Sequence, residues 1–229
     1  MVRGLRLAAI AVAFASAGCD DFRPPSEIVE PQLLGVRVVP PGIAAGEQAR
    51  VEFFVADIDG PITAVEVSWE VIAGPGGAPP LGSIGVDDDG VVYAAPAELD
   101  PEDAPATAII QGTFALPQRD VVAVKAVRVG ARRVNPQIEV VTLDGEPIAE
   151  RGAVTPGAEV ELDVRADIEL EAPTAVTWAV TEGELERFLR TPVTWLVPEN
   201  AEGTAWVYVV VRDDRGGVAW DALPIDIAP

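Results

Sequence analysis

Apolar and polar residues alternate with a period of two along much of this chain. Apolar side chains occupy every second position at Val51, Phe53 and Val55, and again between Val160 and Val164. Because successive side chains of a strand point to opposite faces of a sheet, this spacing predicts strands with one buried face. The 21 glycines and 21 prolines interrupt the pattern often enough for short strands and turns. The pattern therefore predicts an all-β fold.

The same order of features occurs twice. In the first copy, Trp69 lies 23 residues after Gly46, and in the second copy, Trp178 lies 21 residues after Gly157. Each copy then reaches an aromatic-x-x-Pro step, with residues 93–96 (YAAP) in one and residues 195–198 (WLVP) in the other. Agreement in order and spacing indicates an internal repeat. Strands at this density, in units of about 100 residues, predict two β-sandwiches.

The second copy carries the clearer family features at residues 176–178 (VTW), 194–198 (TWLVP) and 203–217. In these features both halves resemble bacterial immunoglobulin-like repeats of envelope and surface proteins. The ending of the second half is also similar to polycystic-kidney-disease-type repeats, although it lacks the Gly-Asp-Gly that usually follows their tryptophan. The resemblance implies tandem immunoglobulin-like sandwiches over residues 32–130 and 131–229. Such domains serve in adhesion, carbohydrate binding, spacing and assembly, so the fold class does not choose a function.

The first 19 residues have the order of an export signal. Arg3 and Arg6 precede an apolar run, and small residues follow it up to Cys19, the only cysteine of the chain. The twelve residues from 7 to 18 are too few to cross a bilayer, which takes roughly 17 to 25. This order predicts export and no permanent transmembrane anchor.

The segment resembles a bacterial lipoprotein signal peptide, although Ser16 stands where that family usually has leucine, valine or isoleucine. The resemblance implies that residues 1–18 are removed and that Cys19 carries a covalent lipid. An ordinary secretory signal with an unmodified cysteine is the alternative. Residues 19–31, with three prolines and no alternation, are expected to form a tether.

Anchoring through a lipid would place the protein on a membrane of the bacterial cell envelope. We expect the outer membrane rather than the inner one. Asp20, directly after the cysteine, resembles an inner-membrane retention signal of some lipoproteins, so the inner membrane is the alternative.

The net charge of −21 argues against nucleic acid as a partner, because binding phosphates requires a clustered cationic surface. The chain contains no histidine, so a Ser-His-Asp site, a Cys-His site and a His-ligated zinc site are excluded. We therefore expect a protein that is not an enzyme and binds no cofactor other than the lipid on Cys19.

Acidic loops raise the question of calcium, which prefers oxygen ligands. Asp87, Asp88 and Asp89 are the calcium candidates, and none of the acidic loops has the EF-hand spacing. Aspartate is also common in turns because its side chain bonds to nearby backbone amides. Solvated turns are the interpretation we favour over a metal site.

Three aromatic residues near the C-terminus are the candidate binding residues. Alternation along residues 205–212 puts the odd-numbered valines on one face of a strand and Trp206 and Tyr208 on the other. A hairpin through residues 213–217 brings Trp220 to the same face. We expect a surface-exposed binding or adhesion module, because such a platform, if exposed, would bind a protein or glycan. Buried against the first domain, it would indicate a structural spacer without a ligand site.

Four basic residues cluster at the expected junction between the domains: Lys125, Arg128, Arg132 and Arg133. We expect them to neutralise carboxylates of the flanking domains. Docking of an anionic partner is the alternative.

Overall fold

Four β-sheets make up the part of the chain that the structure describes, which contains no helix. This computed structural model describes residues 26–73, 78–100, 105–170 and 175–228. The expected signal peptide, the lipid site Cys19 and the first residues of the tether lie outside the described residues. In the described residues no helix is long and apolar enough to cross a membrane.

The first half of the chain folds into a sandwich of two sheets. One sheet has the order β1 (Gln32–Val39), β3 (Gln48–Asp57), β7 (Gly90–Ala94) and β6 (Ser83–Asp87), and β4 (Gly60–Ile62) pairs with β3. The other has the order β2 (Gly42–Ile43), β9 (Asp120–Val129), β8 (Ala106–Ala115) and β5 (Val67–Ile72).

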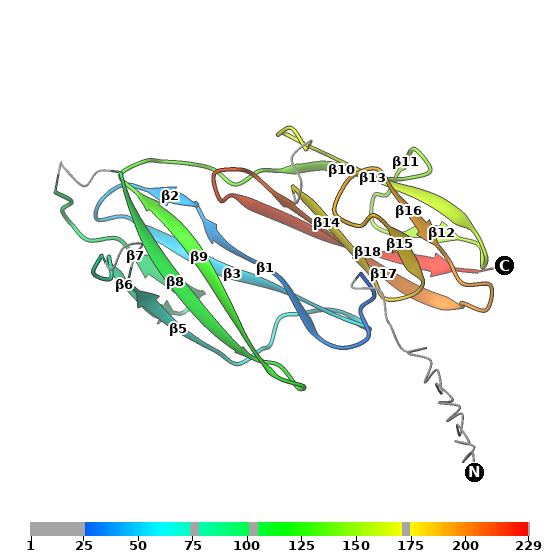
Figure 1. Ribbon diagram of the computed structural model, residues 1–229, viewed down its shortest axis with the longest axis horizontal. Coiled ribbons are helices and arrows are strands. Elements are labelled where there is room, and N and C mark those ends of the chain that lie inside the picture. Colours follow the sequence, from blue (N-terminus) through cyan, green and yellow to red (C-terminus); the bar gives the residue numbers. More distant parts are fainter. Residues whose placement is uncertain (1–25, 74–77, 101–104, 171–174, 229) are drawn as a thin grey trace, which may run out of the picture.

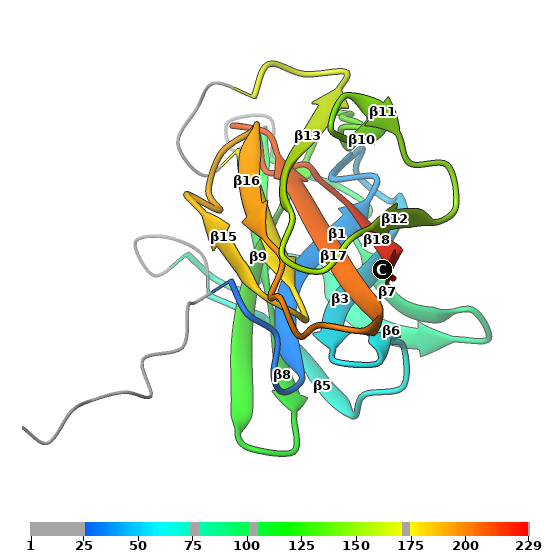
Figure 2. The same cartoon turned by 90° about the vertical axis from the view of Figure 1, so that its right-hand side faces the viewer.

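The second half repeats this arrangement. One sheet has the order β11 (Glu146–Pro147), β10 (Ile138–Leu143), β13 (Glu159–Ala166), β16 (Val193–Leu196) and β15 (Glu184–Glu186). The other has the order β12 (Gly152–Val154), β18 (Val218–Ile227), β17 (Gly203–Arg212) and β14 (Val176–Val180). Figure 1 shows the two sandwiches side by side along the long axis, and Figure 2 shows the molecule from the end of the second.

The strand order of both halves is that of the immunoglobulin fold. If the main strands of each half are lettered in chain order, one sheet reads A-B-E-D and the other reads A′-G-F-C. The A′ and G strands form the only parallel pairings between named strands of the described residues, β2 with β9 and β12 with β18. The prediction of two tandem immunoglobulin-like sandwiches is therefore confirmed.

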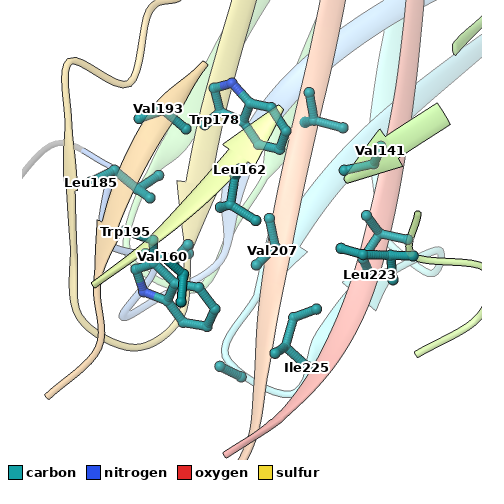
Figure 3. Close-up of a cluster of buried hydrophobic side chains, with 14 of the residues drawn as sticks. Val141, Val160, Leu162, Trp178, Leu185, Val193, Trp195, Val207, Leu223 and Ile225 are labelled. Carbon is teal, nitrogen blue, oxygen red and sulfur yellow. The ribbon is translucent and has the colours of Figure 1, made fainter. Parts of the chain in front are cut away.

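Each sandwich has its own apolar core. Trp178 and Trp195 are completely buried in the second core, where they pack with Leu162, Val207 and Ile225 between the two sheets (Figure 3). The alternation of residues 205–212 is confirmed, because the odd-numbered valines face this core. Trp69, the matching tryptophan of the first copy, lies on the edge strand β5, where it is only partly buried and packs against the first core.

The internal repeat is visible in the turns that precede strands β3 and β13. Gly46 and Gly157 both have φ of +75°, in the left-handed region that favours glycine. The Gly46 N–H donates to the Pro96 carbonyl at 2.8 Å, and the Gly157 N–H donates to the Pro198 carbonyl at 3.1 Å. The glycines and prolines of the two repeat copies therefore close the same turn.

The expected tether is partly packed against the second sandwich. Ser26 and Ile28 exchange backbone hydrogen bonds with Val180 at 2.9 and 2.7 Å, and Glu27 forms a parallel bridge with the same residue. Ile28 is completely buried. The expectation of a tether is therefore wrong for residues 26–28, because Ile28 packs in an apolar cluster and the edge of β14 supplies backbone partners.

Candidate functional site: the interface between the sandwiches

The three candidate aromatic residues lie between the two sandwiches. Tyr208 is 0% exposed, and Trp206 and Trp220 are partly buried. They belong to a third apolar cluster, which we call the interface cluster and which combines both halves of the chain: Ile28, Leu34, Phe54, Ala56, Ala179, Trp206, Tyr208, Val210, Val218, Trp220 and Ala222. The exposed-platform alternative is therefore wrong, because the first sandwich covers this face.

The β17–β18 hairpin brings Trp220 to the face of Trp206 and Tyr208, as expected from the sequence. Trp220 stands opposite Val210, and Trp206 stands opposite Pro224. Alternation therefore gave the correct face of each strand, while the degree of exposure depended on the other domain.

Phe54 of β3 supplies the opposing aromatic surface. Its ring stacks on Trp220, with centroids 5.3 Å apart and an interplanar angle of 3°, and meets Tyr208 edge-on at 5.8 Å. The guanidinium of Arg37 lies over the Trp220 ring, 4.1 Å from its centroid. Aromatic pairs and a cation over an indole each add to the energy of apolar burial. Phe54 follows Phe53 directly, so one of these two aromatic rings has to face away from the core of its own sandwich.

Glycine makes a close approach possible at Gly60, while Gly35 lies at ordinary contact distance. A Cβ on Gly60 would lie 2.9 Å from atoms of the Trp206 ring, and a Cβ on Gly35 would lie 3.5 Å from Trp220. Because an added Cβ at Gly60 would be closer to the ring than van der Waals contact allows, the indole of Trp206 can pack directly on the β3–β4 turn only where residue 60 is glycine.

Hydrogen bonds cross the interface on both sides of the aromatic contact. The Tyr208 hydroxyl donates to the Asp57 carbonyl at 2.6 Å, and burial raises the pKa of this phenol. Arg212 donates to the Leu34 carbonyl at 2.8 Å and to the Thr177 hydroxyl at 2.9 Å. Burial lowers the pKa of this guanidinium.

The linker between β9 and β10, residues 130–137, is also hydrogen-bonded to both sandwiches. The Asn135 side-chain amide donates to the Val38 carbonyl at 2.8 Å, and its oxygen accepts from the Val218 N–H at 2.9 Å. Because one amide satisfies a backbone group on each side, the linker is fixed relative to both domains.

The basic cluster at the junction has mixed partners. Arg132 forms an ion pair with Glu47, as expected for neutralisation of a carboxylate. Lys125 and Arg133 instead donate to the carbonyls of Gly216 and Arg215, at 2.5 and 3.3 Å. Arg128 donates to the Thr107 hydroxyl at 2.5 Å. The expectation therefore holds for Arg132, while the tip of the β17–β18 hairpin presents carbonyls to Lys125 and Arg133.

The calcium candidates form the turn between β6 and β7. Arg50 pairs with Asp87 at 3.4 Å and with Asp89 at 3.3 Å, and the Asp89 N–H donates to the Asp87 carboxylate at 2.9 Å. Within the described ranges, no group of three or more acidic, histidine or cysteine side chains is arranged to hold a metal ion. Asp87 and Asp89 thus bind a backbone amide and an arginine, as turn residues do.

Comparison with known proteins gives matches only among solved structures. No protein-family model matches the sequence, and no curated protein does. Three similar structures are the Ig1-2 module of Drosophila receptor protein tyrosine phosphatase DLAR, fibronectin(III)-like modules of Clostridium thermocellum CbhA, and domains 4 and 5 of S-layer protein SbsC. Their identities are 12, 16 and 14%, and their TM-scores are 0.33, 0.32 and 0.26. In the same order, the matches cover 87, 84 and 86% of this chain and 100, 94 and 100% of the other chain.

Similarity at this level adds nothing about activity or partners. The immunoglobulin-like class follows from the strand order of the two sandwiches themselves.

Proposed function

We propose that this protein is a non-enzymatic, lipid-anchored component of the bacterial cell envelope whose two sandwiches act together as a rigid spacer. The observation that carries the proposal is the burial of Tyr208 and Phe54 between the sandwiches. Domains in one chain move relative to one another by default unless the interface between them is large and apolar. Here an aromatic cluster joins them, and hydrogen bonds from Tyr208, Arg212 and Asn135 accompany it.

A spacer has to hold its two ends at a fixed distance, and the hydrogen-bonded linker supports that role. Asn135 ties the linker to both sandwiches, so bending at the junction would break two hydrogen bonds as well as the aromatic contact. An adhesion module with a binding platform on Trp206, Tyr208 and Trp220 is disfavoured, because these side chains are used between the domains.

The packed N-terminal segment bears on how a lipid anchor would hold the molecule. Ser26 lies seven positions after Cys19 in the chain, which is a reach of at most about 25 Å. Because residues 26–28 bond to β14 beside the interface, the anchor would attach near the junction rather than at the far end of the first sandwich.

Anchoring is tested by metabolic labelling with a radioactive fatty acid in a bacterial expression host. Label in the full chain, and none in a Cys19→Ser variant, is the expected result. An unlabelled and freely soluble mature protein would contradict the lipid anchor.

Rigidity is tested by measuring distances between two spin labels. In a Cys19→Ser background, labels at Val86→Cys and Leu189→Cys report on the first and second sandwich, because these side chains are 81 and 44% exposed. We expect one narrow distance distribution, which Phe54→Asp broadens and the control Val122→Asp does not. A broad distribution in the protein with native Phe54 would refute the spacer.

A further inference from the structure

A groove runs between the first sandwich and the tip of the β17–β18 hairpin. It has a volume of about 380 Å³ and is lined by residues 33–36 of β1, residues 121–125 of β9 and hairpin residues between 212 and 218. Figure 1 shows this hairpin reaching from the second sandwich over the first. None of the groove residues of β9 takes part in the aromatic contact described above.

The groove exposes the free edge of strand β9. This strand pairs with β8 along its whole length, but on its other side it pairs with β2 only at Arg128 and Val129. Among the described residues, no strand pairs with residues 121–126 on that side. Unpaired N–H and C=O groups at a sheet edge are a template for an added strand.

Apolar side chains accompany this free edge. Val122 and Val124 are 57 and 58% exposed, and both line the groove. The corresponding face of the second sandwich carries Trp220 and Ala222, which the first sandwich covers. The same sheet face is therefore covered in the second sandwich and exposed at Val122 and Val124 in the first.

Lys125, the only lysine of the chain, lies at the end of this edge. It stands opposite buried Ile110, four residues before the end of β9. At the same place in the second sandwich, Leu223 stands opposite buried Val207, four residues before the end of β18, and is only 4% exposed. A cation therefore occupies a position that the other repeat copy fills with a core leucine.

Two cations in the groove are bonded to neutral oxygens. Lys125 donates to the Gly216 carbonyl, and Arg212 donates to the Leu34 carbonyl and the Thr177 hydroxyl. Burial lowers the pKa of Lys125 to about 8; nearby Asp213 acts to raise it, and Arg212 acts to lower it. One oxygen of Asp213 is already taken by the N–H groups of Arg215 and Gly217.

Partly buried cations without a bonded carboxylate are costly, and an incoming anion would lower that cost. Among the side chains that line the groove, two are cationic and one is anionic, so the groove is positively charged in a protein of net charge −21.

We propose that this groove binds an extended segment of a partner protein, which adds to the free edge of β9 and places an acidic side chain against Lys125 and Arg212. The backbone edge supplies affinity, the exposed valines accept apolar side chains, and the two cations select the carboxylate. This site goes beyond the spacer function, because it would give the spacer a place to hold a partner.

Two synthetic peptides test the proposal on the full-length protein in detergent. Both have seven residues of alternating threonine and valine, and one has a central glutamate where the other has a central glutamine. Selective labelling with isotopic lysine gives a single backbone amide signal in nuclear magnetic resonance, because Lys125 is the only lysine. We expect the glutamate peptide to shift this signal and to bind about tenfold more tightly than the glutamine peptide.

Variants separate charge recognition from strand addition. By calorimetry, Lys125→Met should remove the preference for glutamate, and Val122→Asp should weaken both peptides. The control Arg128→Met removes a charge from the same strand outside the groove and should leave the preference intact. Absence of binding at millimolar peptide, or equal binding of both peptides, would overturn the proposal. Self-association of Lys125→Met without peptide binding would also overturn it, because the lysine would then only protect a sheet edge.

Discussion

The Tyr208 hydroxyl donates a 2.6 Å hydrogen bond to the backbone carbonyl of Asp57, which lies 151 residues earlier in the chain. Tyr208 belongs to the second sandwich and Asp57 ends strand β3 of the first. This bond lies beside the contact between the rings of Phe54 and Tyr208. One side chain therefore contributes both apolar burial and a directed bond to the joint between the domains.

Removing only this hydroxyl tests the bond. Tyr208→Phe keeps the ring in the interface cluster and leaves the Asp57 carbonyl without this donor. We expect a loss of about 1–2 kcal/mol in the free energy of unfolding, measured with urea. Tyr93→Phe is a matched control inside the first sandwich, where the hydroxyl donates to the Leu81 carbonyl at 2.9 Å. Tyr93→Phe should also destabilise, but without changing the distance distribution between spin labels on the two sandwiches.

The two tyrosines predict alkaline sensitivity. Burial raises the pKa of Tyr93 to about 12, and it raises the pKa of Tyr208 as well, from the ordinary tyrosine value of 10.0. Above pH 10.0 the unfolded state loses these protons before the folded state does, so the free energy of unfolding falls as the pH rises. Because these are the only tyrosines, ultraviolet absorbance should show no tyrosinate until the protein unfolds or the pH nears 12. Titration of a tyrosine in the folded protein near pH 10.0 would contradict this.

Ile28 predicts that the N-terminal segment stabilises the second sandwich. Ile28 is completely buried in the interface cluster and its N–H is bonded to Val180. Ile28→Ala should cost about 2–5 kcal/mol and increase hydrogen exchange at Val180. Val29→Ala is the control, because Val29 is only partly buried and lies outside the cluster. Equal effects of both variants would mean that the segment does not depend on Ile28.

Substitution of Gly183 should strongly destabilise the second sandwich. Its φ is +85°, and an added Cβ would lie 2.3 Å from the Leu196 carbonyl oxygen. Gly203, with φ of +90° and no atom within 4 Å of an added Cβ, isolates the cost of the backbone conformation. We expect Gly203→Ala to cost about 1–2 kcal/mol and Gly183→Ala clearly more, by thermal denaturation. Similar costs for both would show that the chain shifts to relieve the contact.

The lowered pKa of Lys125 should make the free energy of unfolding depend on pH between about 8 and 10.5. Burial lowers its pKa from the ordinary lysine value of 10.5 to about 8 in the folded protein, so between these pH values the folded state binds fewer protons than the unfolded state. The free energy of unfolding should therefore rise with pH across this window. Lys125→Met should be more stable at neutral pH by about 1–2 kcal/mol, allowing for solvent screening, and the difference should shrink between pH 8 and 10.5. A difference that does not change with pH would mean that Lys125 titrates normally.

The sequence by itself determined the strands, their buried faces and the repeat. Alternation depends on local geometry, so the positions of Val207, Val209 and Val211 toward the core followed from spacing alone. The repeated turn followed too, because Gly46 and Gly157 supply the same left-handed conformation. Tertiary structure was not needed for these features.

Only the tertiary structure decided what covers each outer face. Alternation put Tyr208 away from the core of its own sandwich, but it could not distinguish solvent from Phe54 of the other sandwich, because that contact joins residues far apart in the chain. The same reason applies to Ile28, because its hydrogen-bond partner Val180 lies far from it along the chain. It also applies to Lys125, because a lysine on an alternating strand carries no sign that its position holds a core leucine in the other copy. That equivalence follows from strand register, and register is set when the sheets assemble.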